Sequence, residues 1–213
     1  EVTENYIHTL NSSGVPDTMI IDPEYTYQVI VNTLPPVTID SVRLTKGQHN
    51  LTSAYCPRGE LIVSLKNNTQ PNVNPAIIIL DEESGDQVNT QYPFQEISYL
   101  QGSYDIKILT LPVTFIEGLS IEAGKTTRVT LENPGIVSIQ KNIKGFGSIY
   151  QLDENGQQQW VVDINSESGN TESYYLQPGQ YRLVFRSRFS SQSLQTKVKN
   201  VTINTLKTTR IKL

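Results

Sequence analysis

The residues best suited to catalysis are few in this sequence. The chain of 213 residues has two histidines, His8 and His49, and one cysteine, Cys56. A zinc site needs several Cys and His ligands together, and a catalytic nucleophile needs a base held beside it. Each histidine lies in a predicted loop or strand end, and no Gly-x-Ser-x-Gly motif is present. The sequence therefore predicts a protein that is not an enzyme and holds no cofactor, metal ion or catalytic residue.

Two acidic turns carry the other residues that could hold an ion. Asp81-Glu82-Glu83 and Asp153-Glu154 supply carboxylate oxygens, the ligands that calcium prefers. Neither turn has the alternating Asp-x-Asp-x-Asp pattern of a dedicated calcium loop, and each is followed closely by a glycine. The favoured interpretation is structural, with the aspartate bonded to its own turn and the glycine at a positive φ angle. Calcium binding is the alternative.

Aromatic residues are the candidates for ligand binding. Tyr150, Trp160, Tyr174 and Tyr175 could stack on sugar rings if their side chains face solvent in one row. Trp160 lies in the strand-like segment Gln159-Trp160-Val161-Val162 and is expected to be a core residue instead. The ligand-binding residues are therefore left unassigned.

Composition and charge limit the classes of partner. The net charge is −4 at pH 7 and no run of four basic residues occurs, so a nucleic-acid surface is not expected. No apolar stretch approaches the roughly 18 residues of a membrane-spanning helix. Only 18% of the residues are charged, while Asn, Gln, Ser and Thr are abundant, which favours an exported protein, periplasmic or on the cell surface. The first residues contain neither an initiator Met nor a basic segment, so a processed or trimmed chain is expected.

Apolar residues recur at every second position in many segments, which is typical of β-strands with one buried face. Such segments are found at 61–65, 104–108, 136–139, 181–185 and 210–213. Turn clusters separate them: Ser84-Gly85-Asp86, Asn133-Pro134-Gly135, Asn155-Gly156 and Gln177-Pro178-Gly179. No segment has the 3.6-residue period of an amphipathic helix. The predicted fold class is all-β.

An internal repeat organises these strands. Tyr27, Tyr104 and Tyr181 are 77 residues apart, and each begins a predicted strand. Further features recur in the same order: Thr-Leu-Pro at 33–35 and 110–112, Lys-Thr-Thr-Arg at 125–128 and 207–210, and the Leu-Asp-Glu turn at 80–82 and 152–154, more loosely at 10–14. We expect each tyrosine ring to be buried with its hydroxyl bonded to a nearby backbone group.

The repeat divides the chain into modules at 1–57, 59–132 and 135–213. A module of about 75 residues with about six or seven strands has the size of a small antiparallel β-sandwich, Ig-like or transthyretin-like. The junctions at 56–59 and 133–135 are short and contain proline, which predicts stiff connections and an elongated array. Cys56, beside one junction proline, is expected to be a small packed side chain. The first module lacks an opening strand, so it is either a smaller sandwich or one completed by an upstream segment.

These motifs resemble a known kind of module. A Gly-x-Leu/Ile-x-Val strand, an Asp/Asn-Gly turn, a Leu-x-Pro-Gly-x-Tyr strand and a closing Thr-Thr-x-Val-x-Leu strand look like the transthyretin-like or carboxypeptidase-regulatory-like modules of bacterial surface proteins. More closely, 21–27, 33–37, 47–50, 145–150 and 176–179 resemble the region that follows the von Willebrand factor A domain in exported Gram-negative proteins. The resemblance implies a non-catalytic stalk or binding array with an adhesion-type domain upstream. The Asp-x-Ser-x-Ser metal motif of that domain is absent, so its ion-dependent binding is not transferred.

Two functions follow from these patterns. The first is a structural array that spaces or anchors a neighbouring von Willebrand factor A-like domain and contacts proteins along strand edges. The second is a carbohydrate-binding or adhesion module, which requires a row of solvent-facing aromatic residues. The expected partners are a protein, a flanking domain of the same polypeptide, or carbohydrate.

Overall fold

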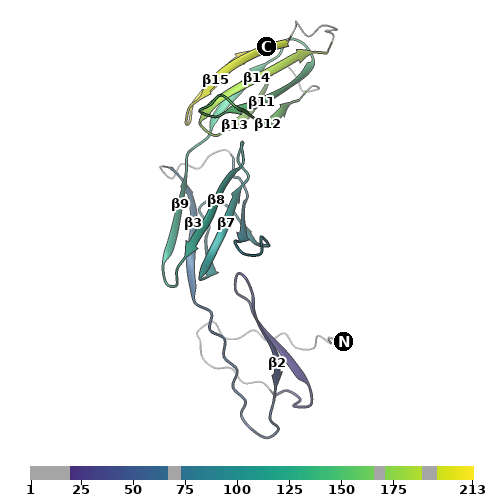
Figure 1. Ribbon diagram of the computed structural model, residues 1–213, viewed down its shortest axis with the longest axis vertical. Coiled ribbons are helices and arrows are strands. Elements are labelled where there is room, and N and C mark those ends of the chain that lie inside the picture. Colours follow the sequence, from purple (N-terminus) through teal and green to yellow (C-terminus); the bar gives the residue numbers. More distant parts are fainter. Residues whose placement is uncertain (1–19, 67–72, 166–170, 189–195) are drawn as a thin grey trace. The chain divides into compact units, whose positions relative to one another are not determined.

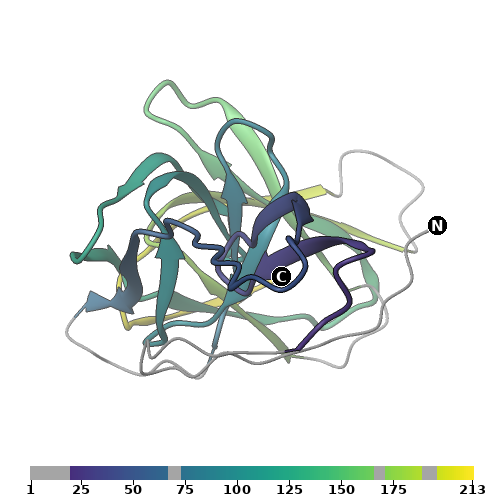
Figure 2. The same cartoon turned by 90° about the horizontal axis from the view of Figure 1, so that it is seen from below.

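The computed structural model describes residues 20–66, 73–165, 171–188 and 196–213, in which strands are found and no α-helix (Figures 1 and 2). The chain divides into two units. One comprises Glu1–Val31 and Pro36–Tyr55, and the other comprises Asn32–Pro35 and Cys56–Leu213. The described part of the first unit holds one antiparallel sheet of two strands, β1 (Thr26–Val31) and β2 (Val37–Arg43). A complete β-sandwich over 1–57 stays a prediction.

The second unit contains two β-sandwiches, named here sandwich A and sandwich B. The strands of sandwich A are β3 (Arg58–Leu65), β4 (Ile77–Asp81), β5 (Gln87–Gln91), β6 (Glu96–Leu100), β7 (Gly102–Ile108), β8 (Thr114–Ile121) and β9 (Thr126–Leu131). The strands of sandwich B are β10 (Gly135–Gln140), β11 (Gly145–Leu152), β12 (Gln158–Ile164), β13 (Thr171–Leu176), β14 (Gly179–Ser187), β15 (Thr196–Ile203) and β16 (Thr208–Lys212). The strands predicted from the two-residue period all coincide with strands of these sandwiches.

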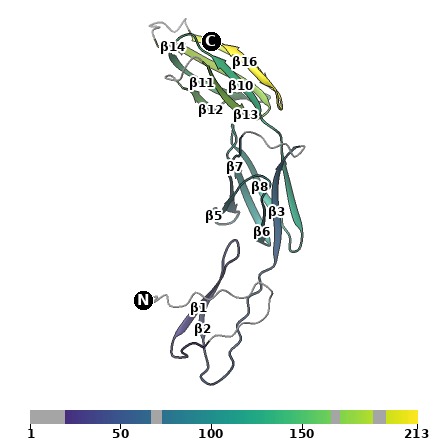
Figure 3. The same ribbon diagram turned by 180° about the vertical axis from the view of Figure 1, so that it is seen from behind.

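Both sandwiches have the same topology. Sandwich A pairs a three-stranded sheet of order β6-β3-β9 with a four-stranded sheet of order β5-β4-β7-β8. Sandwich B repeats this with β13-β10-β16 and β12-β11-β14-β15, whose layers Figures 1 and 3 show from opposite sides. The predicted all-β fold built from small β-sandwiches is confirmed.

Each three-stranded sheet contains one parallel pair. Strand β3 runs parallel to β9, with Leu65 opposite Leu131, and β10 runs parallel to β16, with Ile139 opposite Ile211. The prediction of antiparallel sheets did not include this pairing. As a result, the first and last strands of each sandwich lie side by side.

Each sandwich also closes its own apolar core. Alternate residues of the facing strands are completely buried: Leu61, Val63, Ile77, Ile79, Ile106 and Ile108 in sandwich A, and Val137, Ile139, Ile149 and Leu183 in sandwich B. This is the pattern expected when the inner faces of two sheets pack together.

The repeated tyrosines anchor these cores. Tyr104 and Tyr181 are buried, and their hydroxyls donate to the backbone oxygens of Leu100 (2.9 Å) and Gln177 (2.6 Å). The expectation of a buried ring with a backbone-bonded hydroxyl is therefore confirmed for both. The half-buried Tyr27 makes a comparable bond to the Asp22 oxygen, at 2.7 Å.

Gly135 is required where β10 passes close to a neighbouring turn. A Cβ atom there would lie 2.4 Å from the Asn204 oxygen and 2.6 Å from Ile203 Cγ2. We expect Gly135→Ala to destabilise sandwich B by about 1–3 kcal/mol, because backbone atoms must move. The measurement is urea unfolding followed by the fluorescence of Trp160, the single tryptophan. Gly179→Ala is the control, because its Cβ would meet side-chain atoms only at 3.5 Å and beyond; equal losses in both variants would contradict this account.

Candidate functional site

The structure describes two of the three residues that the sequence singled out for possible catalysis, His49 and Cys56. His49 is exposed and Cys56 is half-buried, while His8 lies outside the described residues. Within the described ranges, no group of three or more His, Cys, Asp or Glu residues could hold a metal ion. In the same ranges, no helix is long and apolar enough to cross a membrane. The absence of enzymatic activity stays a prediction.

The acidic turns use their aspartates to stabilise the backbone. Asp81 Oδ1 accepts a hydrogen bond from the Ser84 N–H at 2.8 Å, and the Ser84 bonds hold the pKa of Asp81 below its ordinary value. Asp153 Oδ1 accepts the N–H groups of Asn155 and Gln157, at 2.9 and 2.7 Å. Gly85 and Gly156, in the same two turns, have φ angles of +73° and +78°. Both turns therefore have the hydrogen bonds and glycine angles that the structural interpretation predicts, and the expectation that they hold no calcium stays a prediction.

A repeated contact occurs where the Leu-Pro loops meet the sandwiches. The Leu100 N–H donates to the Leu34 oxygen at 2.7 Å, and the Gln177 N–H donates to the Leu111 oxygen at 2.7 Å. Leu34 packs against the core of sandwich A, and Leu111 packs against the core of sandwich B. Leu100 and Gln177 are also the residues whose oxygens accept the tyrosine hydroxyls. Each loop is therefore joined to the residue that anchors the buried tyrosine.

The threonine before each of these leucines shapes the loop. Thr33 Oγ1 donates to the Pro35 oxygen and Thr110 Oγ1 donates to the Pro112 oxygen, each at 2.6 Å. Both threonines are buried. We call the two loops, residues 33–35 and 110–112, the junction loops. Their contacts recur 77 residues apart, as the sequence repeat does.

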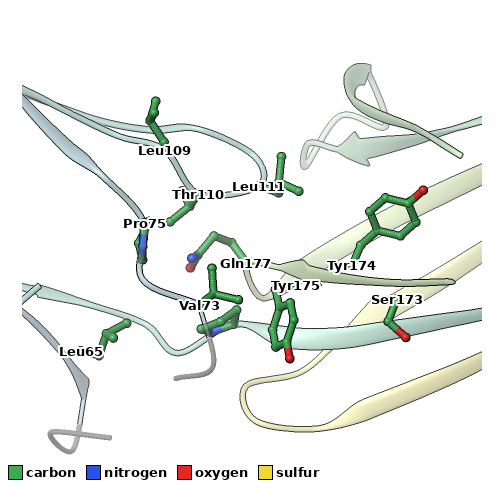
Figure 4. Close-up of a pocket in the computed structure, with 11 residues that line it drawn as sticks. Leu65, Val73, Pro75, Leu109, Thr110, Leu111, Ser173, Tyr174, Tyr175 and Gln177 are labelled. Atoms are coloured by element: carbon green, nitrogen blue, oxygen red, sulfur yellow. The ribbon is translucent and has the colours of Figure 1, made fainter. Parts of the chain in front are cut away.

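A cavity of about 260 Å³ lies beside the second junction loop (Figure 4). Tyr174 and Tyr175, two of the predicted sugar-stacking residues, line it together with Leu109, Leu111 and Gln177. None of its lining residues is charged. Figure 4 shows the two tyrosine rings pointing in different directions from β13, so they do not form one stacking row.

Sandwich B contains a buried ion pair that the sequence patterns did not indicate. Lys141 Nζ contacts Glu172 Oε1, and their side chains are only 3% and 10% exposed. Lys141 also donates to the Asn165 oxygen, and Glu172 Oε2 accepts the Tyr174 hydroxyl at 2.5 Å and the Asn165 N–H at 3.1 Å. The pair therefore connects β13 with the segments that follow β10 and β12.

The ion pair and its neighbours perturb each other's ionisation. Burial acts to raise the pKa of Glu172, but hydrogen bonds from Lys141, Tyr174 and Asn165 outweigh it and lower that pKa below its ordinary value of 4.5. Burial, assisted by Glu172, raises the pKa of Tyr174 to about 12. At neutral pH Glu172 is therefore charged and Tyr174 is a hydrogen-bond donor. Burial and the bonds among Lys141, Asn165, Glu172 and Tyr174 account for both shifts, so we assign this cluster a structural role.

The expectation that Trp160 is a core residue is wrong: 57% of its surface is exposed. Ile149 lies opposite Val162, but Tyr150 lies opposite Trp160, so β12 carries a bulge at Val161. Strict alternation from the inward-facing Val162 would place Trp160 in the core. The extra residue turns its side chain to the outer face instead, because a shift of one residue exchanges the faces of a strand.

The exposed tryptophan belongs to a row that crosses the outer face of the four-stranded sheet. Trp160 on β12 lies opposite Tyr150 on β11, Tyr150 lies opposite Arg182 on β14, and Arg182 lies opposite Asn200 on β15. The order of these strands is visible in Figure 1. We call these four residues the aromatic row. The sequence singled out Tyr150 and Trp160 but not Arg182 or Asn200, because the latter join the row only through strand pairing.

Hydrogen bonds fix several side chains on this face. Asp163 Oδ1 accepts hydrogen bonds from Trp160 Nε1 (2.9 Å) and Ser148 Oγ (2.6 Å). The bond from Ser148, followed by that from Trp160, lowers the pKa of the Asp163 carboxyl. Arg182 Nε donates to Asn200 Oδ1 at 2.9 Å. Trp160 and Asn200 are exposed, Tyr150 and Arg182 are half-buried, and hydrogen bonds hold Trp160, Arg182 and Asn200 in place.

No protein-family model and no curated protein matches the chain. Among similar solved structures, the Bacillus anthracis TIE protein is 14% identical with a TM-score of 0.30, and the match covers 74% of this chain and 33% of that one. The minor pilin GBS52 of Streptococcus agalactiae is 11% identical with a TM-score of 0.37, and the match covers 73% of this chain and 94% of that one. The shaft pilin SpaA of Lactobacillus rhamnosus GG is 8% identical with a TM-score of 0.30, and the match covers 74% of this chain and 97% of that one. The chain thus spans a third of the length of the TIE protein. Similarity of this degree leaves function to be argued from the chain's own residues.

Proposed function

We propose that this chain is a non-catalytic, exported array of β-sandwich modules that spaces or anchors a neighbouring domain and makes protein contacts. The neighbouring domain we propose is of the von Willebrand factor A type. The module boundaries we propose are 1–57, 59–132 and 135–213. The main support for the proposal is the contact that each junction loop makes with a sandwich, through Leu34 in one loop and Leu111 in the other.

The junction loops have the properties of connectors. Each presents a leucine to the core of a sandwich and a backbone oxygen to the residue that anchors the tyrosine of that sandwich. Burial of the leucine stabilises the connection through apolar contact, while the hydrogen bond gives it direction. A spacer requires connections of this kind, because a flexible linker would not hold a neighbouring domain at a defined place.

Strand β15 is the edge that we propose for protein contacts. The other edges of the four-stranded sheets, β5, β8 and β12, each carry a change of register against the neighbouring strand. Such bulges disfavour the addition of a further strand. By contrast, β15 pairs regularly with β14 along its full length, from Gly179 opposite Ile203 to Arg186 opposite Thr196. Its outer backbone groups can therefore accept a strand from a partner.

Small-angle X-ray scattering together with Leu111→Ala tests the spacer function. A compact domain of this length would have a radius of gyration of about 17 Å, and we expect a clearly larger value for the intact chain. We expect Leu111→Ala to destabilise sandwich B by about 1–3 kcal/mol and to broaden the distribution of interatomic distances, because the junction loses its apolar contact. Urea unfolding followed by Trp160 fluorescence gives the stability change.

Leu51→Ala is the matched control, because the Leu51 side chain is 82% exposed and its truncation should change neither measurement. The spacer function would be contradicted by a compact wild-type chain. It would be contradicted equally if Leu111→Ala left both stability and the scattering curve unchanged. The alternative function, carbohydrate binding, is supported by a different observation, the aromatic row.

A further inference from the structure

We propose that the outer face of the β12-β11-β14-β15 sheet binds a neutral oligosaccharide along the aromatic row. The proposal goes beyond the spacer function and does not depend on it. It rests on the geometry of Trp160, Tyr150, Arg182 and Asn200 and on the side chains that hold them.

Trp160 is exposed and yet held in place. Its indole N–H donates to Asp163, which also accepts a bond from Ser148 on the neighbouring strand. A ring fixed in this way loses little conformational entropy when a ligand stacks on it. The exposed ring on the edge of sandwich A differs: Phe115 is 59% exposed, but the Lys107 ammonium lies 5.7 Å from its ring centre. Trp160 therefore offers a prepared apolar surface, whereas Phe115 already has a partner.

The chemistry of the row matches that of a sugar. A pyranose ring has an apolar C–H surface that stacks on an aromatic ring, and a rim of hydroxyl groups that donate and accept hydrogen bonds. The row supplies aromatic surface at Trp160 and Tyr150 and polar groups at Arg182 and Asn200, on the next two strands. The Nη atoms of Arg182 and the amide nitrogen of Asn200 are donors, and the carboxylate of Asp163 is an acceptor.

The charges on this face favour a neutral ligand. Asp163, on the same strand as Trp160, is negative, and Arg182, farther along the row, is positive; Arg186, four residues farther along β14, adds a second positive charge to this face. A hydroxyl group can donate to Asp163 and accept from an arginine, whereas an acidic polymer would complement only the arginines and be repelled by the carboxylate beside Trp160. The row crosses four strands, which are about 4.8 Å apart, so it extends for about 14 Å. That length suits a chain of sugars better than a single ring.

A protein partner fits this face less well. Tryptophan, tyrosine and arginine also occur often in protein interfaces, but the carboxylate of Asp163 lies beside Trp160, and aspartate is depleted in such interfaces. The bulge in β12 also disfavours addition of a strand at this edge. The observations therefore favour a glycan.

Fluorescence titration of the intact chain tests the proposal, because Trp160 is its single tryptophan. The probes are cellohexaose, xylohexaose, mannohexaose and laminarihexaose, with polygalacturonate as the acidic comparison. We expect at least one neutral hexasaccharide to change the Trp160 emission saturably. Tyr150→Ala should weaken this binding by about tenfold or more, since one of two stacking surfaces is lost. Calorimetry on Trp160→Ala, which has no fluorescent reporter, should show no binding.

Phe115→Ala is the matched control and should bind as the wild type does. Thermal unfolding of every variant establishes that the sandwiches are folded. The proposal is overturned if no neutral hexasaccharide binds, or if Phe115→Ala weakens binding as much as Tyr150→Ala. It is also overturned if only polygalacturonate binds and moderate salt abolishes the effect, because binding would then depend on charge rather than stacking.

Discussion

Glu172→Gln is expected to lower the free energy of unfolding of sandwich B by about 3–5 kcal/mol, because Lys141 would remain buried without its counter-charge. The Lys141 side chain is only 3% exposed, so water cannot replace the lost carboxylate. The Tyr174 hydroxyl and the Asn165 N–H, which both donate to Glu172, would lose a charged acceptor as well. Urea unfolding followed by Trp160 fluorescence measures the loss.

The double variant Lys141→Met, Glu172→Leu separates the cost of an unpaired charge from the value of the pair. Apolar residues of similar volume can replace a buried ion pair with little loss, so we expect the double variant to be more stable than Glu172→Gln. If instead the double variant were the less stable of the two, the pair itself would stabilise the sandwich and the explanation above would fail.

The same pair predicts how stability depends on pH. The pKa of Glu172 is lower in the folded state than its ordinary value of 4.5. Its contribution to stability is therefore complete well above pH 4.5 and is lost as the pH falls through the lower, folded-state pKa. Acid unfolding of the wild type should show this loss, and the double variant should show a weaker dependence on pH in that range.

Tyr181→Ala is the second substitution with a large expected effect, about 3–5 kcal/mol, because it removes a completely buried ring from the core of sandwich B. Tyr181→Phe should cost only about 0.5–1.5 kcal/mol, since the ring stays and one hydrogen bond, to the Gln177 oxygen, is lost. Urea unfolding of both variants gives the comparison. Equal losses would mean that the hydroxyl, rather than the ring, anchors the core.

Tyr104 provides an independent repetition of this experiment in sandwich A. Its ring is 3% exposed and its hydroxyl donates to Leu100 at 2.9 Å, so Tyr104→Phe should again cost much less than Tyr104→Ala. Sandwich A contains no tryptophan, so its unfolding is measured by near-ultraviolet circular dichroism of the intact chain, with the Trp160 fluorescence transition identifying the part that belongs to sandwich B. A reversed order of the two variants would show that the repeated tyrosines have different roles.

Local patterns were sufficient to predict the strands and the buried tyrosines. The two-residue period that begins at Tyr104 and Tyr181 reports directly which face of a strand is buried, so β7 and β14 could be recognised without a structure. The parallel pairing of β3 with β9 could not be predicted in this way. Its partners, such as Glu60 and Thr126, are distant in the chain and meet only when both sheets have formed.

The aromatic row shows where extrapolation of a local pattern fails. The alternation at 160–164 points Trp160 inward, and a single extra residue at Val161 points it outward. Bulges follow from how a strand fits its neighbour, and the segment 158–164 contains no glycine or proline to mark one. Arg182 and Asn200 belong to the aromatic row because strand pairing places them in line with Tyr150, and this pairing is not visible in the sequence.

The sequence by itself predicts the all-β class, the turns at Asp81 and Asp153 and the 77-residue repeat. Turn geometry and strand period depend on residues close together in the chain, so local patterns are enough to recognise them. The contact between Lys141 and Glu172 and the outward position of Trp160 came only from packing. Whether a charged side chain is buried, and which side of the sheet a residue faces after a bulge, depend on contacts between segments far apart in the sequence. These contacts exist only in the folded sandwich.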